Sequence, residues 1–216
     1  MTDQEESERK RKRFPDMNRE SYNKIALDWN DARKGFFGRE RAYLDAVLEA
    51  APEGATILDL GCGTGRPMAE YAVSRGYRII GVDQSESLLA LAQARLPQER
   101  WILASIETVD IRDAYAGAIL WDSLFHIRRS KHDAVLAKVV GNLPQGGRLM
   151  ATVGGSEHPP FTDLMFGQRF FYDSHTPAQA ERILRSLGCR LVLAEFMNVP
   201  DGAADKGRYA IVAERT

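Results

Sequence analysis

The chain has 216 residues, enough for one sizeable α/β core and too few for two ordinary domains. Its formal net charge is −1 and its pI about 6.4, which argues against a global field that attracts nucleic acid. Two cysteines, Cys62 and Cys189, make no disulfide framework, so we expect a reduced, cytoplasmic setting. Because the N-terminus is charged and no segment is long and apolar enough, we expect neither a signal peptide nor a membrane span.

The first fifty residues are predicted to form a tail and two helices. Residues 1–13 are highly charged and carry five consecutive basic residues, so we expect a disordered, solvated tail. Over 14–50, apolar side chains recur at helical spacing in two stretches, 21–34 and 39–50. These two amphipathic helices precede the rest of the fold.

From residue 55 onward, strand-like and helix-like segments alternate, as in a doubly wound α/β sheet. Short apolar segments predict seven strands at 56–60, 78–82, 101–104, 117–121, 148–153, 190–195 and 208–213. Helical patterns fall at 67–75, 85–96, 131–140 and 176–187, the last with a capping box that starts at Thr176. Since the connection between the last two strands is too short for a crossover helix, we expect the last strand to be antiparallel.

The first of these strands leads into a glycine turn, residues 58–65, which read LDLGCGTG. Glycines let the backbone turn sharply and approach a ligand, and the free amides of the following helix favour an anion. Asp83 ends the second strand, where a carboxylate can hold ribose hydroxyls. A dinucleotide motif requires a third glycine where this chain has Arg66 or Met68. The turn therefore suits a nucleoside ligand that carries an amino acid in place of phosphates.

This turn resembles that of the class I S-adenosylmethionine-dependent methyltransferases. The resemblance continues through GVDQS at 81–85, AILWDSLFH at 118–126 and LPQGG at 143–147, and spans most of residues 20–213. It implies a single methyltransferase domain over 14–216, with a Rossmann-like core at 55–216 and cap helices at 14–50. It also implies an enzyme that transfers a methyl group from S-adenosylmethionine to a small-molecule acceptor, leaving S-adenosylhomocysteine.

The resemblance and the strand order together predict a cofactor site at the carboxyl ends of the strands. The glycines would line the methionine part, Asp59 would meet its ammonium group, and Asp83 would hold the ribose. Ser105 stands where the family commonly has an acid for the adenine amino group. The cofactor-binding candidates are Asp59, Gly61, Cys62, Gly63, Gly65, Asp83, Gln84, Ser105, Ile106, Trp121, Tyr22, Trp29 and Arg33. The alternatives are an ordinary strand–helix turn and, for the aromatics, the buried stripe of a helix.

His126 follows the fourth strand and is the candidate general base, which is needed only if the acceptor loses a proton. Its alternative role is structural, at the start of the next helix. The aromatic segment 158–175 is either an acceptor pocket or a packed lid. The substrate-binding candidates are Asp122, His158, Phe161, Arg169 and Tyr172. His158 and His175 lack partners at metal-ligand spacing, so we expect no metal site.

Two other functions remain open from the sequence. A nicotinamide-dependent oxidoreductase is disfavoured by the missing third glycine, whereas a non-catalytic S-adenosylmethionine-binding regulator would keep the same motifs. Residues 121–124 read WDSL and lack the Asn/Asp-Pro-Pro-Tyr/Phe motif of DNA amino-methyltransferases, so we expect neither a nucleic-acid partner nor a membrane. The sequence leaves open the acceptor, the accepting atom and the oligomeric state.

Overall fold

The computed structural model describes residues 3–202 and 205–216, with backbone alone for 3–15. Seven strands form one sheet in the order β3-β2-β1-β4-β5-β9-β8. Their bounds are β1 Thr56–Leu60, β2 Arg78–Asp83, β3 Arg100–Leu103, β4 Gly117–Leu120, β5 Arg148–Gly154, β8 Cys189–Asn198 and β9 Arg208–Arg215. β1 to β5 pair in parallel, and β9 runs antiparallel to both β5 and β8. The predicted fold class is confirmed.

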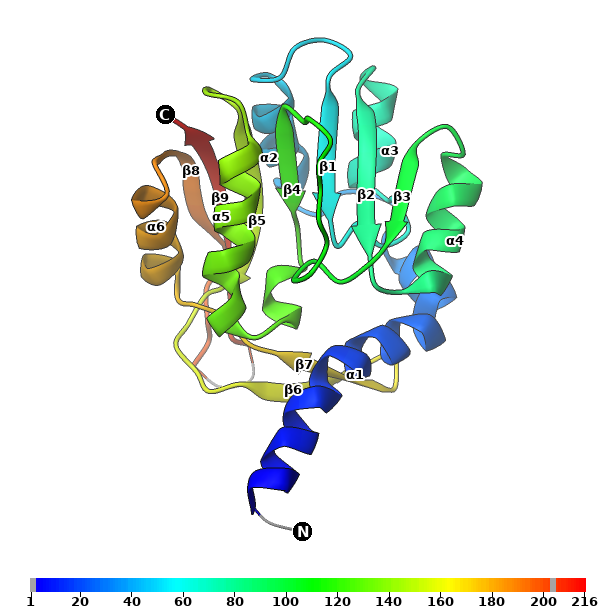
Figure 1. Ribbon diagram of the computed structural model, residues 1–216, viewed down its shortest axis with the longest axis vertical. Helices are drawn as coiled ribbons and strands as arrows, with labels where there is room; N and C mark the ends of the chain where they lie inside the picture. The colour runs from blue at the N-terminus through cyan, green and yellow to red at the C-terminus, as the bar shows by residue number, and fades with distance from the viewer. Residues whose placement is uncertain (1–2, 203–204) are drawn as a thin grey trace.

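Helices cover both faces of this sheet (Figure 1). The α-helices are α1 Asp3–Ala32, α2 Glu40–Leu48, α3 Met68–Ser74, α4 Glu86–Arg95, α5 His132–Asn142 and α6 Pro177–Ser186, and two 3-10 turns are η1 Leu124–His126 and η2 Arg129–Lys131. α2 and α3 pack on one face, and α5 and α6 on the other. Thr176 caps α6 in the predicted capping box with Gln179, and Ser85 caps α4.

α1 begins earlier than the sequence predicted. Its backbone is helical from Asp3, so the disordered tail expected for 1–13 is replaced by helix over 3–13, and residues 1–2 lie outside the described residues. The physical reason is composition, because Glu, Gln, Lys and Arg dominate this segment and have high helix propensity. The packed part of the same helix also supplies the nucleus from which these turns extend.

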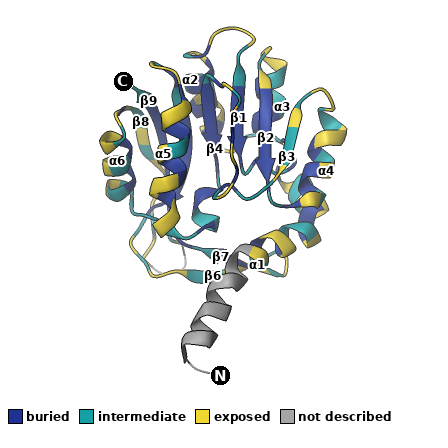
Figure 2. Ribbon diagram, viewed as in Figure 1, coloured by how far each residue is buried: buried dark blue, intermediate teal, exposed yellow. Residues whose placement is uncertain are grey.

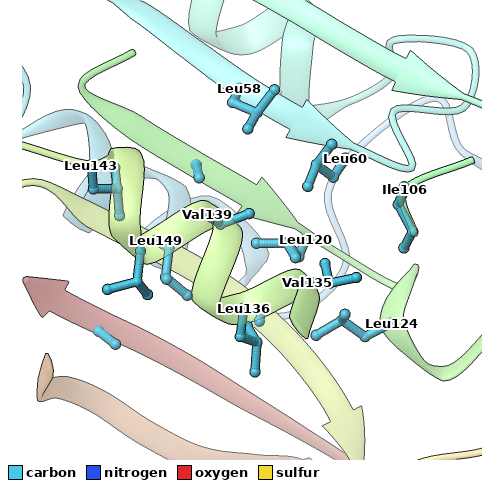
Figure 3. Close-up of a cluster of buried hydrophobic side chains, with 14 of the residues drawn as sticks. Leu58, Leu60, Ile106, Leu120, Leu124, Val135, Leu136, Val139, Leu143 and Leu149 are labelled. Atoms are coloured by element: carbon cyan, nitrogen blue, oxygen red, sulfur yellow. The ribbon is translucent and has the colours of Figure 1, made fainter. Parts of the chain in front are cut away.

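The strands are buried because apolar side chains alternate between the two faces of the sheet and both faces are covered by helices. In β1, Leu58 and Leu60 point to the face covered by α5, and Ile57 points to the opposite face covered by α2 and α3. Figure 3 shows the hydrophobic cluster on the face covered by α5, in which Val135 and Val139 of α5 pack against strand residues. Each such side chain contributes roughly 1.5–3 kcal/mol on burial. β1, β2 and β4 are therefore buried on both faces along most of their length (Figure 2).

A hairpin that the sequence did not predict stands apart from the sheet. β6 Phe161–Met165 and β7 Gln168–Tyr172 pair antiparallel through the two-residue turn Phe166-Gly167. Both turn residues have positive φ, 49° and 73°, as in a type I′ turn, but phenylalanine is unusual at its first position. α1 contacts β7, and the two lie across the carboxyl ends of the parallel strands (Figure 1). This arrangement closes the edge where a ligand would bind.

Candidate active site

One cavity lies at the carboxyl ends of β1, β2 and β4, beneath α1. It is lined by twelve of the thirteen predicted cofactor-binding residues, namely Tyr22, Trp29, Arg33, Asp59, Gly61, Cys62, Gly63, Asp83, Gln84, Ser105, Ile106 and Trp121. Asp122 and His126 line the same cavity, together with Arg66, Met68, Leu88, Ser123 and Ile127, which the sequence did not single out. Residues from α1, the glycine turn and η1 thus meet in one space.

The glycine turn brings the end of β1 close to its neighbours. Gly61 has φ +83°, and an added Cβ would lie 2.3 Å from the Cβ of Ser123, so only glycine fits there. Gly63 has φ +55°, and its added Cβ would lie 3.6 Å from Nε1 of Trp29. Gly65 differs from the prediction, because it does not line the cavity and its added Cβ would meet Trp101 at 3.2 Å. The absence of a side chain at Gly65 therefore permits the turn to pack against Trp101.

Two buried carboxyl groups lie at the ends of neighbouring strands. Burial, reinforced by the nearby charge of Asp83, raises the pKa of Asp59 to about 8. Burial also raises the pKa of Asp83, against amide hydrogen bonds that lower it. Those amides are Ser85 N, 2.8 Å from Oδ1, and Gly63 N, 2.9 Å from Oδ2. Each oxygen of Asp83 retains a lone pair for a ligand, and a cation beside Asp59 would restore its ionised form.

His126 has one defined tautomer. Its Nδ1 lies 3.1 Å from the carbonyl oxygen of Phe171, which only accepts hydrogen bonds, so Nδ1 carries the proton. Its Nε2 lies 2.9 Å from the hydroxyl of Tyr22 and accepts from it. Burial lowers the pKa of His126 to about 4 and raises the pKa of Tyr22 well above its usual value. Both groups are therefore neutral near pH 7, and the pair forms a continuous hydrogen-bonded path.

Aromatic rings surround this pair. Tyr22 contacts Trp29 at 5.7 Å and Phe170 at 4.7 Å between ring centroids. The ring of Tyr172 lies 5.0 Å from that of His126, and its pKa is raised to about 12 by burial. Such edge-to-face contacts hold rings in fixed orientations. The surroundings of His126 are therefore aromatic and rigid, and Phe170 among them is completely buried.

Four of the five predicted substrate-binding residues, Tyr172 among them, do not line the cavity. Phe161 stacks on the outer side of Tyr172 at 5.2 Å, and Arg169 donates to Thr162 Oγ1 on the exposed surface of the hairpin. His158 lies in a second groove with Arg129 and other residues of the η2 region. The sequence grouped them with Tyr172 because it read 158–175 as one segment. Arg169 and Tyr172 are three residues apart on β7 and so point to opposite faces of the hairpin, whereas Phe161 pairs with Tyr172 across the strands and shares its face.

A chain of paired charges borders the cavity on its other side. Arg33 donates to both carboxylate oxygens of the buried Glu40, at 3.1 and 3.2 Å, and Trp121 Nε1 donates to Glu40 at 3.0 Å. Arg208, from β9, lies 3.7 Å from Glu40 and donates to both oxygens of Asp122, at 2.7 and 2.5 Å. Sequence reasoning missed Glu40 and Arg208, although a charged residue at the start of an apolar strand is a usable signal.

Asp122 adopts a backbone conformation that few residues tolerate. Its φ is +51°, in the left-handed region, and its amide donates to Thr152 Oγ1 at 2.6 Å. The same hydroxyl donates to Asp122 Oδ1 at 3.1 Å. Together with Arg208, these bonds hold the carboxylate at the cavity edge.

Comparison with known proteins agrees with this fold and site. The family model of a methyltransferase domain matches residues 57–147. Trans-aconitate 2-methyltransferase of Variovorax paradoxus is 33% identical over 150 residues, covering 64% of this chain and 55% of that protein. Magnesium-protoporphyrin O-methyltransferase of Rhodobacter capsulatus is 33% identical over 103 residues, 46% of each chain. The chain spans about half the length of the curated relatives it matches.

Solved structures share the fold over nearly the whole chain. The 1,6-didemethyltoxoflavin-N1-methyltransferase of Burkholderia thailandensis, with its acceptor and S-adenosylhomocysteine bound, has a TM-score of 0.69 and 21% identity, covering 94% of this chain and 89% of that one. Magnesium protoporphyrin IX methyltransferase of Synechocystis PCC 6803, with S-adenosylmethionine bound, has a TM-score of 0.68 and 16% identity, covering 94% and 97%.

Residues 57–147 thus match a methyltransferase domain, and the chain has the fold of solved S-adenosylmethionine-dependent methyltransferases, which bind S-adenosylmethionine or S-adenosylhomocysteine. The predicted family and cofactor are thus confirmed. Among the helices that the structure describes, none has the length and apolar character needed to cross a membrane.

Proposed function

We propose that the protein transfers the methyl group of S-adenosylmethionine to a small, uncharged acceptor that has a flat or apolar part and a removable proton. The observation that carries this proposal is the 2.9 Å contact between Tyr22 and His126 in the cavity lined by the cofactor motifs. When bound, the cofactor supplies a methyl group already activated by a sulfonium. The protein then has to hold the acceptor in line, exclude water and receive a proton.

The residues of the cavity fit this cofactor. Asp59 would hold the ammonium group, because a cation relieves the penalty that raises its pKa to about 8. Asp83 would hold the ribose hydroxyls through the lone pairs left free by Gly63 and Ser85. The space between Gly63 and Trp29 would receive the methionine part of the cofactor. Ser105 and Ile106 would border the adenine.

The proton would leave the acceptor through Tyr22. The acceptor gives its proton to the Tyr22 oxygen while Tyr22 passes its own to Nε2 of His126, so no free phenolate forms. Methyl transfer removes the positive charge from sulfur as the imidazolium gains one, and the net charge of the site is unchanged. The carbonyl of Phe171 and the charge of Asp122 both favour the imidazolium.

An acceptor rich in carboxylates fits this site poorly. The arginines that line or border the cavity are already paired, Arg33 with Glu40, Arg66 with Glu70 and Arg208 with Asp122. A tricarboxylate such as trans-aconitate would have to break these pairs to be neutralised. The aromatic side chains that line the cavity, Tyr22, Trp29 and Trp121, instead favour a planar ring.

Release of S-adenosylhomocysteine with a panel of acceptors tests the proposal. Heteroaromatic and phenolic compounds with an acidic N–H or O–H should be methylated, and trans-aconitate should not. His126→Asn and Tyr22→Phe should each lower kcat by roughly 10²–10⁴-fold with the best acceptor and leave cofactor affinity unchanged. Turnover of trans-aconitate above that of every ring compound, or full activity in both variants, would contradict it. Tight cofactor binding with no turnover across a broad panel would favour the non-catalytic regulator.

A further inference from the structure

Asn18, on α1, is the most completely buried polar side chain beside His126. None of its surface is exposed, and it makes three hydrogen bonds, all to backbone atoms of other elements. Its Nδ2 donates to the carbonyl oxygens of His126 at 3.0 Å and of Phe171 at 3.1 Å. Its Oδ1 accepts from the amide of Phe171 at 2.7 Å. The side chain thus joins α1, η1 and β7 at one point.

The orientation of this amide is fixed by its partners. Phe171 N–H is a donor and must face Oδ1, so the NH2 group must face the two carbonyls. A flipped amide would oppose donor to donor and acceptor to acceptor. Asn18 consequently occupies both the N–H and the C=O of Phe171, as a neighbouring strand would.

The carbonyl that Asn18 holds is the one that sets the tautomer of His126. Phe171 O accepts both from Asn18 Nδ2 and from Nδ1 of His126, at 3.1 Å each. Asn18 also holds the backbone carbonyl of His126 itself. The imidazole therefore has its main chain and its Nδ1 partner tied to the same side chain, which leaves Nε2 directed at Tyr22.

We propose that Asn18 is a positioning residue, which keeps His126 in the Nδ1-protonated form and so keeps Nε2 free to receive a proton from Tyr22. The effect of Asn18 on catalysis rests on the proposed function. Its effect on the tautomer of His126 can be measured without any acceptor.

A purely structural role for Asn18 would be to fasten α1 to β7, and the chain contains a matched control for that role. Ser21, one turn further along α1, donates from Oγ to the carbonyl of Arg169 on β7 at 2.7 Å. Ser21→Ala removes a contact between the same two elements and touches neither Phe171 nor His126. A fastening role predicts the same result for both positions.

The test is long-range 1H–15N correlation NMR of ¹⁵N-histidine-labelled protein, with His126 assigned through His126→Asn. We expect the parent and Ser21→Ala to show the Nδ1-protonated ring. In Asn18→Ala and Asn18→Asp we expect the Nε2-protonated form to appear and the pKa of His126 to rise by about one unit, as water or a carboxylate favours the imidazolium. With an acceptor in hand, kcat should fall about tenfold or more in these variants with KM little changed.

Three results would overturn the inference. The first is an Nε2-protonated His126 in the parent, which decides the matter even if neither variant folds. The second is a tautomer and pKa unchanged from the parent in a folded Asn18 variant. The third is the same change in Ser21→Ala. Failure to find an acceptor contradicts only the proposed function, because the NMR readout involves no turnover.

Discussion

The hydroxyl of Tyr22 lies 2.9 Å from Nε2 of His126, although the two residues are 104 positions apart. Tyr22 belongs to the cap helix α1, and His126 belongs to η1, which follows the central strand β4. Neither residue forms part of the glycine turn, so the proton path and the cofactor motif come from separate parts of the chain. The pair therefore exists only while α1 lies over the carboxyl ends of the strands.

The pH dependence of turnover should not show the titration of a histidine with an ordinary pKa. Because burial lowers the pKa of His126 to about 4, its ring stays neutral and able to accept a proton at pH 5 and above. We expect kcat to be free of any His126 titration between pH 6 and 8, and to fall only as pH approaches 4. A kcat profile with an apparent pKa near 6.5 that disappears in His126→Asn would contradict this.

Folding stability should fall on acidification for the same reason. The unfolded chain binds a proton on each histidine at about pH 6.5, whereas folded His126 and His132, whose pKa values burial lowers to about 4, do not. Between pH 6.5 and 4 the unfolded state therefore binds more protons, and stability is lost as pH falls through this window. We expect the fall in Tm over that range to be smaller in His132→Asn than in the parent. Equal slopes would show that these histidines take up protons when folded.

Cofactor affinity should rise with pH up to about 8. Asp59 is protonated below that pH because burial and Asp83 raise its pKa to about 8, and an ammonium group binds best to the ionised form. Binding below pH 8 should therefore release a proton, detectable by calorimetry in buffers of different ionisation enthalpy. Asp59→Asn should bind more weakly at pH 8 and lose the part of the pH dependence that Asp59 contributes. Proton release that persists in Asp59→Asn would assign it to another group.

Gly63→Val should abolish most cofactor binding, and Gly38→Val offers a matched control. The two glycines have nearly equal φ, +55° and +54°, so valine strains both backbones alike. An added Cβ at Gly38 meets nothing within 4 Å, whereas at Gly63 it points toward Trp29 across the proposed methionine site. We expect similar losses of Tm and at least a hundredfold weaker binding, about 2.7 kcal/mol, only in Gly63→Val. Equal binding by both variants would show that the space between Gly63 and Trp29 does not hold the cofactor.

Arg208 and Asp122 should behave as a coupled pair. Removing the guanidinium in Arg208→Met leaves a partly buried carboxylate unpaired in a left-handed conformation and should reduce the free energy of unfolding by about 2–4 kcal/mol. The double variant Arg208→Met with Asp122→Asn should recover a large part of that loss, because no unpaired charge remains. Urea unfolding of the parent, of Arg208→Met, of Asp122→Asn and of the double variant gives the coupling energy, and additive effects would mean that the pair does not hold the site together.

The parts of the fold that follow from local pattern were predictable. β1 begins and ends where apolar periodicity placed it, at Thr56 and Leu60, and the capping box at Thr176 fixed the start of α6. The β6–β7 hairpin was not predictable, because its turn uses Phe166 where a type I′ turn usually has asparagine or glycine. The sequence therefore grouped Arg169 with Tyr172 in one aromatic segment, whereas strand alternation puts the two on opposite faces of the hairpin.

The grouping of twelve proposed cofactor-binding residues around one cavity was also predictable, since glycines and strand-end acids lie close to one another in sequence and share one edge of the sheet. Gly65 was the exception, because only tertiary packing against Trp101 distinguishes it from Gly63. The charge chain of Glu40 and Arg208 and the buried amide of Asn18 were missed for a different reason. Each depends on partners more than 80 positions away, at Trp121, Asp122 and His126, and no local pattern encodes such contacts.

The separate two-stranded sheet of β6 and β7 has a consequence for how acceptor choice can change. Within the described part of the chain, β6 and β7 pair only with each other, so residues of the hairpin can be exchanged without altering the register of the seven-stranded sheet. Phe170 and Tyr172 come from this hairpin, whereas Asp59, Gly63 and Asp83 come from the sheet and its first turn. We therefore expect that hairpins of different sequence, grafted between β5 and α6, would change the surroundings of His126 while leaving the proposed cofactor-binding residues in place.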